Sequence, residues 1–377
     1  MHKPLTIAVD VRDLRVAKTG THTYLEEVCN EFKKMNSDDL RFHFFDTVIP
    51  VYTGSNKLLK LIEHARYQLW KQLILPLKAF FKSCDIVFCT DNFVPLIHLG
   101  YKTIPVFHDA FFFESPEQYS KLWLWLYYKT AVPAARRSPF VVTPTEYAKK
   151  QINHYTHIAN EKLVVVHEGA KTLNFDGDVN GTDSVLKSFL LTPHQYILHV
   201  GSMYKRKNIP ALIHAFSKLK NTRYGGLKLV LAGPTPVNKF GNDDHQQILN
   251  AIADTKLEND VVLTGYMPND ALAQLYKNAQ LYIFPSVNEG FGIPVLEAFA
   301  HDLPVLVANN TCLPEVGGDA VLQFDPFDTD DMFQKMQTVL NDTGLQKEMI
   351  SKGRERLKHF SWHKTALELV DVFRKAL

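Results

Sequence analysis

Two series of short apolar segments, which alternate with amphipathic segments of helical period, constrain the fold of this 377-residue chain most strongly. Strands that are apolar along their whole length and alternate with helices form parallel sheets covered by helices on both faces. We therefore predict an α/β fold with two doubly wound parallel sheets. The predicted strands span residues 6–11, 42–45, 85–89, 104–108, 140–143 and 162–166, and then 196–200, 227–233, 260–265, 281–284 and 304–308.

The two series indicate two domains, because a chain of this length exceeds what one hydrophobic core usually supports. Residues 171–189 separate the series and are rich in Asn, Asp and Gly, as a linker would be. We place the boundary near residues 175–190, which gives a first domain over 1–180 and a second over 181–360. Residues 361–377 are predicted to form a last helix with an apolar face.

The composition excludes some classes of protein. Lys and Arg total 42 against 40 acidic residues, and this balance argues against a nucleic-acid partner, which needs a concentrated basic face. The four cysteines lack paired C-x-x-C spacing, and the chain opens without a charged and then apolar leader. No long uncharged apolar run is present. We expect a reduced, cytoplasmic protein without a membrane-spanning helix.

The segment "NEGFGIPVLEAFA", residues 288–300, follows a predicted strand and opens a predicted helix. Ligands of open parallel sheets bind at this end of the strands. Gly290 and Gly292 let the backbone approach a ligand beside the positive end of the helix dipole. Glu297 can accept two hydrogen bonds from a vicinal diol, and Glu289 can accept others. Alternatively, Glu289 is a loop charge and Glu297 only complements the dipole.

A second cluster of polar residues lies in "HVGSMYKRKN", residues 199–208, between a predicted strand and a predicted helix. Gly201 and Ser202 come first, and Arg206 and Lys207 follow. A guanidinium and an ammonium at this position can neutralise a diphosphate. Adjacent cations at the start of a helix are also typical of a solvated turn, so this alternative stays open.

The segments "PSVNEGFGIPVLEAFA" and "PVLVANNTCLPEVGGDAVLQFDPFD" resemble glycosyltransferase family 4, whose members are retaining enzymes of GT-B architecture with two glutamates separated by seven residues. The resemblance implies two Rossmann-like domains facing across a cleft, the first for the acceptor and the second for a nucleotide sugar, with the last helix crossing back to the first domain. Many members have glycine where this chain has Asp302, at the end of a helix.

The resemblance also implies roles for individual residues. Glu297 would hold the nucleotide ribose and Glu289 the donor sugar, while Arg206 and Lys207 would bind the phosphates. His108 would lie beside the reactive sugar carbon, although a histidine at the edge of the core is the alternative, and Asp109 could orient its ring. The implied catalytic residues are His108, Glu289, Arg206 and Lys207, and the donor-binding residues are Gly20, Gly201, Ser202, Gly290, Phe291, Gly292, Ile293 and Glu297.

The segment over residues 57–82 is unusually basic, with six cations against one acid, Glu63. A basic amphipathic helix can lie on an anionic membrane, so the segment indicates a peripheral membrane contact. The alternative is that its leucines, Leu61, Leu69, Leu73 and Leu77, pack under the sheet. Pro76 is expected to interrupt the helix.

We therefore expect a retaining hexosyltransferase. It would move a hexose, with mannose favoured, from GDP-mannose or a UDP-hexose to a hydroxyl of a saccharide or lipid-linked acceptor, in cell-surface polysaccharide or glycan synthesis. No cofactor and no metal are expected, because cations and helix N-termini can stabilise the leaving diphosphate. Two alternatives remain open at this stage: a nucleotide-sugar epimerase of the same architecture, and a non-catalytic protein that binds sugar nucleotides.

Overall fold

A computed structural model describes residues 3–16, 20–54, 56–171, 173, 185–234 and 244–377. The chain divides into two compact units, one formed by Met1–Gly169 with Trp362–Leu377 and the other by Ala170–Ser361. The division at Gly169 precedes the boundary that we placed near residues 175–190. Most of the predicted linker lies outside the described residues.

The first unit is built on a parallel four-stranded sheet of order β2-β1-β3-β4. A parallel pair, β5-β6, continues beyond it, because Val106 after β4 bridges to Val142 of β5. Because β1 lies between β2 and β3, the chain switches direction across the sheet there, and such switch points are where ligands of α/β sheets bind. The strands are β1 Leu5–Asp10, β2 Leu40–Phe45, β3 Ile86–Cys89, β4 Lys102–Pro105, β5 Val141–Thr143 and β6 Leu163–Val165.

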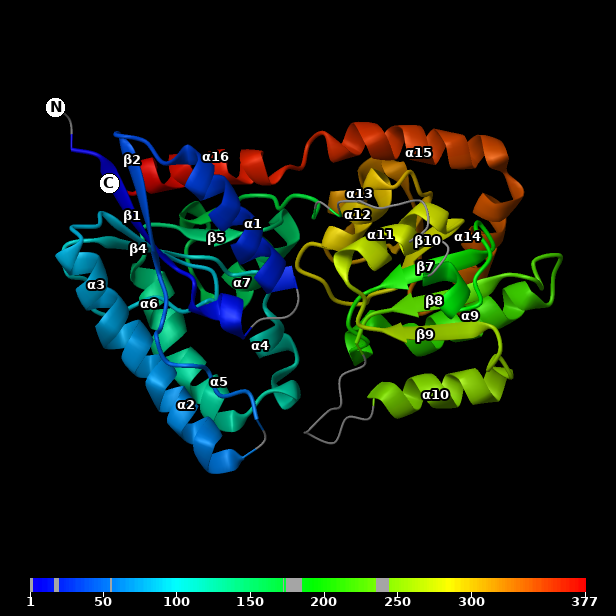
Figure 1. Ribbon diagram of the computed structural model, residues 1–377, viewed down its shortest axis with the longest axis horizontal. Coiled ribbons are helices and arrows are strands. Elements are labelled where there is room, and N and C mark those ends of the chain that lie inside the picture. Colours follow the sequence, from blue (N-terminus) through cyan, green and yellow to red (C-terminus); the bar gives the residue numbers. More distant parts are fainter. Residues whose placement is uncertain (1–2, 17–19, 55, 172, 174–184, 235–243) are drawn as a thin grey trace. The chain divides into compact units, whose positions relative to one another are not determined.

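Helices surround this sheet, and the last helix of the chain belongs to this unit (Figure 1). The α-helices are α1 Gly20–Met35, α2 Lys57–Leu69, α3 Leu75–Phe81, α4 Phe111–Glu114, α5 Lys121–Leu126, α6 Val132–Arg137, α7 Glu146–Thr156 and α16 Trp362–Lys375. Three 3-10 turns, Arg12–Arg15, Pro116–Gln118 and Asn160–Lys162, complete the unit. Within the described residues, no helix combines the length and the apolarity needed to cross a membrane.

Aromatic side chains attach α16 to the rest of the first unit. Trp362 packs edge to face against Tyr24 of α1, with the ring centroids 5.6 Å apart. Phe373 contacts Phe32 of α1 and Phe88 of β3, at centroid distances of 6.0 Å and 5.2 Å. All five side chains are buried. Because aromatic pairs bury large apolar areas, these contacts account for the inclusion of the last helix in this unit.

Two prolines lie inside continuous helical runs, each directly after a π turn. The π turn Trp70–Ile74 joins α2 to α3, which contains Pro76, and the π turn Tyr127–Ala131 joins α5 to α6, which contains Pro133. Proline has no N–H and its ring clashes with the carbonyl four residues earlier in an α-helix. The wider turn accommodates that clash. The α-helix is thus interrupted by a π turn directly before Pro76, although the helical run continues through it.

The second unit contains a six-stranded parallel sheet of order β12-β11-β10-β7-β8-β9. The predicted α/β fold with parallel sheets is confirmed in both units. The first strand of this sheet, β7, lies between β8 and β10, which places the switch point between β7 and β10. The strands are β7 Tyr196–Val200, β8 Lys228–Ala232, β9 Val261–Gly265, β10 Leu281–Phe284, β11 Val305–Ala308 and β12 Val321–Phe324.

The helices of the second unit pack around this sheet in Figure 1. They are α9 Ile209–Lys220, α10 Asp244–Thr255, α11 Asn269–Asn278, α12 Ile293–Ala300, α13 Leu313–Gly317, α14 Thr329–Asn341 and α15 Thr343–Leu357. Two 3-10 turns, Lys205–Lys207 and Gly318–Ala320, precede α9 and β12. Asp302, where related sequences often have glycine, has a positive φ of 56° after α12, and its carboxylate pairs with Arg354. The departure from glycine therefore falls at a backbone position that glycine favours.

Two glycines bring the ends of β7 and β8 unusually close. Gly233 follows β8 with a φ of +142°, and a Cβ there would lie 2.1 Å from the carbonyl oxygen of Gly201. Gly201 follows β7, and its N–H donates to Ala232. No side chain fits at residue 233 without moving the backbone of residue 201.

We predict that Gly233→Ala lowers the free energy of unfolding of the second unit by about 2–5 kcal/mol, because the new methyl group meets backbone and the φ is strained. Calorimetric melting of the whole chain measures this loss. Gly226→Ala is the matched control, since a Cβ at Gly226 meets no atom within 4 Å. Equal melting shifts for the two variants would contradict the close approach.

Candidate functional site

The candidate site lies at the carboxyl edge of the second sheet, at the switch point between β7 and β10. The turn Lys205–Lys207 follows β7, and the loop 285–292 follows β10. The two segments are joined by a hydrogen bond in which the N–H of Val287 donates to the carbonyl of Arg206 at 2.8 Å. The topology thus brings together the two polar clusters singled out in the sequence.

A buried ion pair between Lys207 and Glu289 forms the centre of this site. The Nζ of Lys207 donates to the Oε1 of Glu289 at 2.5 Å, and each residue is 8% exposed. Burial would raise the pKa of Glu289, but the charges of Lys207 and Arg206 outweigh it and lower that pKa. Burial lowers the pKa of Lys207, against the opposing effect of Glu289. Each charge therefore depends on the other to remain ionised in a poorly solvated place.

Glu297 lies on α12 and has different neighbours. The hydroxyl of Tyr276, on α11, donates to its Oε2 at 2.8 Å. Burial raises the pKa of Glu297 to about 7, although the Tyr276 bond and the charge of Lys171 act in the opposite direction. Burial and the charges of Glu297 and Glu289 raise the pKa of Tyr282, so both carboxylates act on the same buried tyrosine. The two glutamates thus share one edge of the sheet but differ in charge state near neutral pH.

The loop between the two glutamates leads into the N-terminus of α12. Gly292 caps the helix with a φ of +103°, which favours glycine. Ile293 is the first helical residue, and the first N–H groups of a helix have no partner within it. The thiol of Cys312 donates to the carbonyls of Glu289 and Phe291 at 3.2 Å and 3.1 Å. The loop is therefore fixed through its carbonyls at the start of a helix, where an anion is favoured.

The predicted donor-binding residues that follow β7 lie beside the ion pair. Gly201 has a φ of +152°, and a Cβ on it would lie 3.6 Å from the Nζ of Lys207. Ser202 is half-buried and accepts a hydrogen bond from the N–H of Tyr204 at 2.8 Å. The guanidinium of Arg206 lies 4.9 Å from the ring centroid of Tyr204. Of the two cations, Lys207 is thus the one placed directly on Glu289.

Polar residues of this site that were not predicted from the sequence include His199, Tyr276 and Cys312. His199 is wholly buried within β7, and its position in an otherwise apolar strand was the available signal. Tyr276 contacts Glu297 from α11, and no local pattern relates the two. Cys312 is a lone cysteine without a paired neighbour in the sequence, so its role in fixing the loop could not be inferred.

His108, the predicted catalytic histidine, belongs to the first unit. It lies in the loop after β4, which ends at Pro105, and not at the end of a strand as predicted. Its Nδ1 lies 3.3 Å from the Oε1 of Glu168 and its Nε2 lies 3.0 Å from the carbonyl oxygen of Thr90. Burial would lower the pKa of His108, but Glu168 outweighs burial and raises it. Because both partners are acceptors, the arrangement favours an imidazolium that donates from both nitrogens.

The expectation that Asp109 orients this ring is wrong, because Glu168 is the carboxylate on its Nδ1. Asp109 instead accepts a hydrogen bond from the N–H of Phe111 at 3.0 Å. Gly20 is the first residue of α1 and is exposed, and a Cβ there would meet no described atom within 4 Å. The preceding residues 17–19 lie outside the described part of the chain, so the role of Gly20 stays a prediction.

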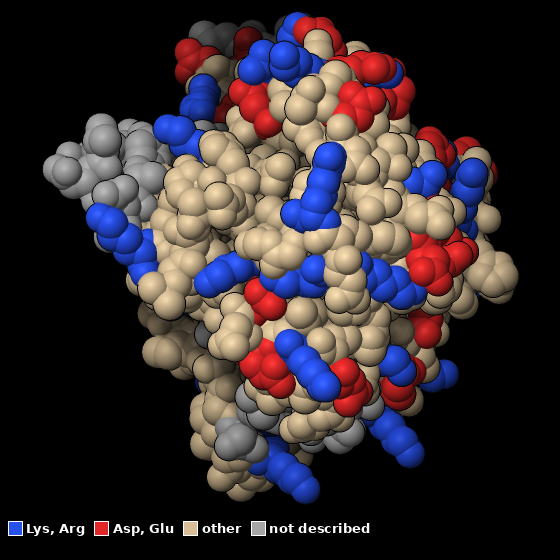
Figure 2. Space-filling view, turned by 90° about the vertical axis from the view of Figure 1, so that its right-hand side faces the viewer, with Lys and Arg blue, Asp and Glu red and all other residues tan. Residues whose placement is uncertain are grey.

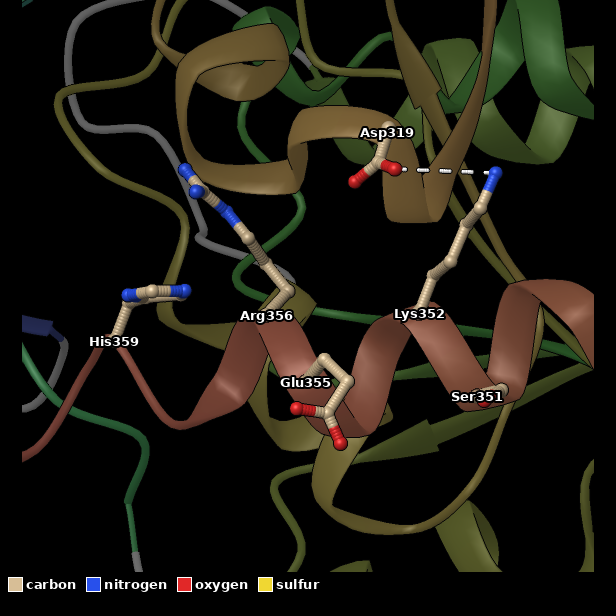
Figure 3. Close-up of a pocket in the computed structure, with 6 residues that line it drawn as sticks. All are labelled: Asp319, Ser351, Lys352, Glu355, Arg356 and His359. Atoms are coloured by element: carbon tan, nitrogen blue, oxygen red, sulfur yellow. Dashed lines mark ion pairs between the residues drawn. The ribbon is translucent and has the colours of Figure 1, made fainter.

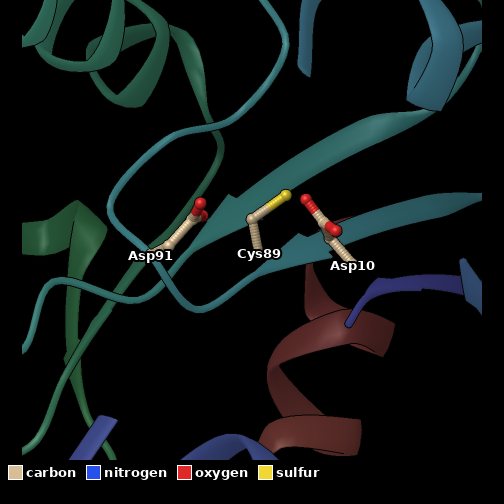
Figure 4. Close-up of side chains that lie close together, drawn as sticks. All are labelled: Asp10, Cys89 and Asp91. Atoms are coloured by element: carbon tan, nitrogen blue, oxygen red, sulfur yellow. The ribbon is translucent and has the colours of Figure 1, made fainter. Parts of the chain in front are cut away.

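One group of potential metal ligands lies together among the residues that the structure describes: Asp10, Cys89 and Asp91, at the carboxyl ends of β1 and β3 (Figure 4). The Nζ of Lys71 lies 2.5 Å from Asp10 and 2.6 Å from Asp91. Burial would lower the pKa of Lys71, but the two aspartates raise it well above its usual value. The ammonium already supplies the positive charge between the carboxylates, so the group does not fit a divalent cation.

A separate surface hollow lies along α15 and is lined by charged groups (Figure 3). Its Lys352 pairs with Glu348 at 2.7 Å and with Asp319 at 3.8 Å. The guanidinium of Arg356 donates to the carbonyls of Val316 and Glu315 at 3.0 Å and 2.5 Å. These side chains join α15 to α13 and to the turn before β12, and neither Lys207 nor Glu289 is among the residues that line the hollow.

Figure 2 shows how charged side chains are distributed on one face of the protein, which is relevant to the prediction that the protein has no nucleic-acid partner. Basic and acidic side chains are interspersed on this face and separated by uncharged residues. A protein that binds nucleic acid through phosphates presents a continuous basic patch. A row of basic side chains crosses the middle of this face, and acidic side chains lie beside it, so the basic residues do not form a patch free of acidic charge.

This chain is similar to known proteins in sequence and in fold. Residues 187–356, nearly all of the second unit, match the family described as glycosyl transferases group 1. O-antigen chain mannosyltransferase B of Escherichia coli is 24% identical over 373 residues, which cover 99% of this chain and 93% of that protein. The serotype-specific mannosyltransferase WbdA of Escherichia coli is 28% identical over 288 residues, and this match spans only 35% of its length.

Among solved structures, a sucrose-phosphate synthase from Thermosynechococcus elongatus is similar to this chain with a TM-score of 0.73. The match covers 98% of both chains at 17% sequence identity, so it concerns the fold. It spans both units, each with its parallel sheet, and the architecture is therefore GT-B. Residues 187–356 match the glycosyl transferases group 1 family within this GT-B fold, and the comparisons support a glycosyltransferase activity for the chain.

Proposed function

We propose that this protein transfers mannose from GDP-mannose to a hydroxyl of a saccharide or lipid-linked saccharide, with retention of the anomeric configuration and without a metal. The observation that carries the proposal is the buried Lys207–Glu289 pair at the switch point of the group 1 domain, with Glu297 at the same edge. The two Escherichia coli proteins named above are mannosyltransferases, and the match to the first covers 99% of this chain and 93% of that protein, which favours mannose.

The diphosphate of the donor would bind to Lys207 and Arg206. In the absence of a donor, Glu289 is the counterion of Lys207, and both groups avoid the cost of a buried single charge. A diphosphate is a second anion that can take over the ammonium. Glu289 would then turn its oxygens to hydroxyls of the sugar. Binding of phosphate and binding of sugar are thereby coupled through one ion pair.

The ribose of the nucleotide would bind to Glu297. An ionised carboxylate accepts hydrogen bonds from both hydroxyls of a diol, whereas the protonated form offers less acceptor capacity. Burial holds Glu297 half protonated near pH 7. Nucleotide binding would therefore draw a proton off this carboxyl and add a charge-assisted bond.

Retention would follow from a displacement on one face of the sugar. The bond from the anomeric carbon to the leaving phosphate oxygen breaks, and the acceptor oxygen forms the new bond from the same side. The acceptor proton passes to the leaving phosphate, so the products are the glycoside and the nucleoside diphosphate. Glu289 is not a covalent nucleophile in this account, because its carboxylate would accept hydrogen bonds from hydroxyls of the sugar. Lys207, Arg206 and the N-terminus of α12 would stabilise the charge of the diphosphate.

The two other functions considered from the sequence differ in what they consume. An epimerase would change or release the sugar without an acceptor, and a binding protein would leave the donor intact. The family of the domain and the mannosyltransferases similar to the chain favour transfer over both.

We also propose that the first unit contacts an anionic membrane through the helical run over α2, the π turn and α3. The alternative, that its leucines pack under the sheet, does not fit the structure, since Leu61, Leu69, Leu73 and Leu77 are 39–52% exposed. Phe81 is 77% exposed. Lys71 is buried and does not count as a surface cation, contrary to the count made from the sequence. The remaining cations are Lys57, Lys60, Arg66, Lys78 and Lys82.

Such a run would place apolar side chains among lipid tails and cations at the headgroups, and each surface cation would add about 1 kcal/mol. A membrane position also suits a lipid-linked acceptor, which would remain in the bilayer during transfer. The protein would then act at the cytoplasmic face of that membrane.

The transfer itself is tested with GDP-mannose, with and without an oligosaccharide acceptor, followed by product analysis. We expect mannosylated acceptor, retained stereochemistry, and full activity in EDTA. Lys207→Ala should weaken binding of the donor by about 1.5–3 kcal/mol, because a phosphate loses a charged partner. Lys205→Ala, on the exposed neighbouring lysine, is the control and should keep its activity. Loss of mannose from the donor without an acceptor would indicate an epimerase or hydrolase, and activity restored only by added metal would overturn the metal-free account.

Glu297 predicts proton release on nucleotide binding. Its raised pKa means that most molecules carry this proton at pH 6 and few do at pH 8. GDP affinity should rise with pH through about 7 and then level off, and calorimetry in buffers of different ionisation enthalpy should detect the released proton at pH 6. The stability of the protein without nucleotide should change with pH in the opposite direction to the GDP affinity. The raised pKa of Glu297 stabilises the fold at acidic pH, and this contribution is lost as pH rises through 7.

Glu297→Gln should abolish this proton release and weaken GDP binding. Glu289→Gln is the matched control, because the pKa of Glu289 is lowered and it has no proton to release. The account of the ribose would be wrong if Glu297→Gln releases as many protons as the parent protein, or if Glu289→Gln abolishes the release.

The membrane contact is tested by flotation with vesicles of phosphatidylglycerol and phosphatidylcholine. We expect binding to the anionic vesicles, reduced at least about ten-fold by the double variant Leu73→Gln/Phe81→Gln, because two side chains no longer leave water. Phe327→Gln, which removes a 79% exposed phenylalanine of the second unit, is the control. Equal binding by all three proteins, or no preference for anionic lipid, would contradict the contact.

A further inference from the structure

His199 lies inside the second sheet, and one of its two ring nitrogens has a hydrogen-bond partner among the described residues. Its side chain is wholly buried on β7, and its Nδ1 lies 3.0 Å from the carbonyl oxygen of Ile283 on β10. A carbonyl only accepts, so Nδ1 carries the hydrogen and Nε2 has a free lone pair. Burial and the charge of Lys207 lower the pKa of His199 to about 4, so the ring is neutral near pH 7.

Among the residues that the structure describes, the Nε2 of His199 has no hydrogen-bond partner, although this nitrogen is shielded from water. Buried polar atoms in native proteins are nearly always paired, and an unpaired acceptor destabilises the fold. An apolar residue at this position of the strand would avoid that cost. A donor that reaches this nitrogen in another state of the site would pair it.

Lys207 is a hydrogen-bond donor that lies near this nitrogen. A Cβ on Gly201 would lie 3.8 Å from the Nε2 of His199 and 3.6 Å from the Nζ of Lys207, so both nitrogens border the same small space. The two side chains also share Phe284: the ammonium lies 4.6 Å from its ring centroid, and the imidazole centroid lies 5.6 Å from it. An ammonium has three N–H groups, and Glu289 takes one of them.

We propose that His199 is a positioning residue for Lys207: its Nε2 accepts a hydrogen bond from the ammonium when Lys207 turns from Glu289 to the phosphates of the donor. The proposal rests on the proposed function, since it requires a diphosphate on Lys207. A neutral acceptor fixes the direction of the ammonium and leaves its full charge for the phosphate. A second carboxylate in the same place would compete with the phosphate for that charge.

A purely structural role for His199 would act through the other nitrogen, the Nδ1 that bonds to Ile283. Two amide substitutions separate the roles. The amide of Asn reaches about the place of Nδ1 and can keep the bond to Ile283, but it has no atom at the place of Nε2. The longer Gln can place its oxygen near Nε2 and gives up the bond near Nδ1.

The experiment measures the affinity for GDP by calorimetry in His199→Asn and His199→Gln, each with Lys207 present and in the Lys207→Ala background. We expect His199→Asn to weaken GDP binding about ten-fold and His199→Gln to stay within about three-fold of the parent protein. In the Lys207→Ala background neither substitution should change the affinity by more than about two-fold, because coupled residues are not additive. His199→Leu replaces the Asn variant, with the same expected loss, if that variant does not fold.

The opposite pattern, in which Asn preserves GDP affinity and Gln loses it, would assign His199 to the structure of the sheet alone. A ten-fold loss from His199→Asn that persists in the Lys207→Ala background would also overturn the proposal, because the effect would not pass through Lys207. Unchanged GDP affinity in Lys207→Ala itself is a different failure: it would remove the diphosphate from Lys207 and with it the proposed donor site.

Discussion

The buried ion pair between Lys207 and Glu289 is the interaction on which the rest of the site depends. Lys207 and Glu289 follow two strands, β7 and β10, which are adjacent in the sheet but separated by two others in sequence. Removing one partner would leave a buried charge without compensation, which is strongly unfavourable. The pair therefore keeps two reactive charges in place in a protein that has no ligand bound, and a ligand with an anion and hydroxyl groups can exchange partners with it.

The packing around this pair explains why several small or unusual residues are needed. Gly201 and Gly233 let the ends of β7 and β8 approach until a side chain no longer fits, and Gly201 leaves room beside the ammonium. Cys312 fixes the carbonyls of the loop that carries Glu289. The first unit uses a similar device at its own switch point, where the ammonium of Lys71 lies between Asp10 and Asp91. In both units a lysine forms an ion pair at the carboxyl ends of neighbouring parallel strands.

Much of this architecture could be predicted from the sequence, because apolar strands and amphipathic helices repeat with clear periods. The strand β12 was not predicted. It lies at the edge of the sheet, and its exposed Gln323 interrupts the apolar run by which the other strands were identified. An interruption of the helix at Pro76 was expected, but its form, a π turn, has no local sequence signature and could not be predicted. The leucines of the basic segment fit a core face as well as a surface in sequence, and only the fold distinguishes the two.

Prediction of the site was limited in a similar way. The residues on the two loops carry their own motif, so Lys207, Glu289 and Glu297 could be chosen from the sequence, and the structure brings the first two into contact. Partners that come from other elements could not be chosen: Tyr276 reaches Glu297 from α11, and Glu168 replaces Asp109 as the partner of His108. These pairings depend on tertiary packing, which the spacing of residues in one segment does not contain.

The most direct test of the central claim is a crystal structure of the protein with GDP-mannose bound. The account predicts the diphosphate within hydrogen-bond distance of the Nζ of Lys207, the ribose hydroxyls on Glu297, and the carboxylate of Glu289 turned from Lys207 to the mannose. A bound nucleotide that leaves the Lys207–Glu289 pair intact, with its phosphates and ribose on other residues, would contradict the account.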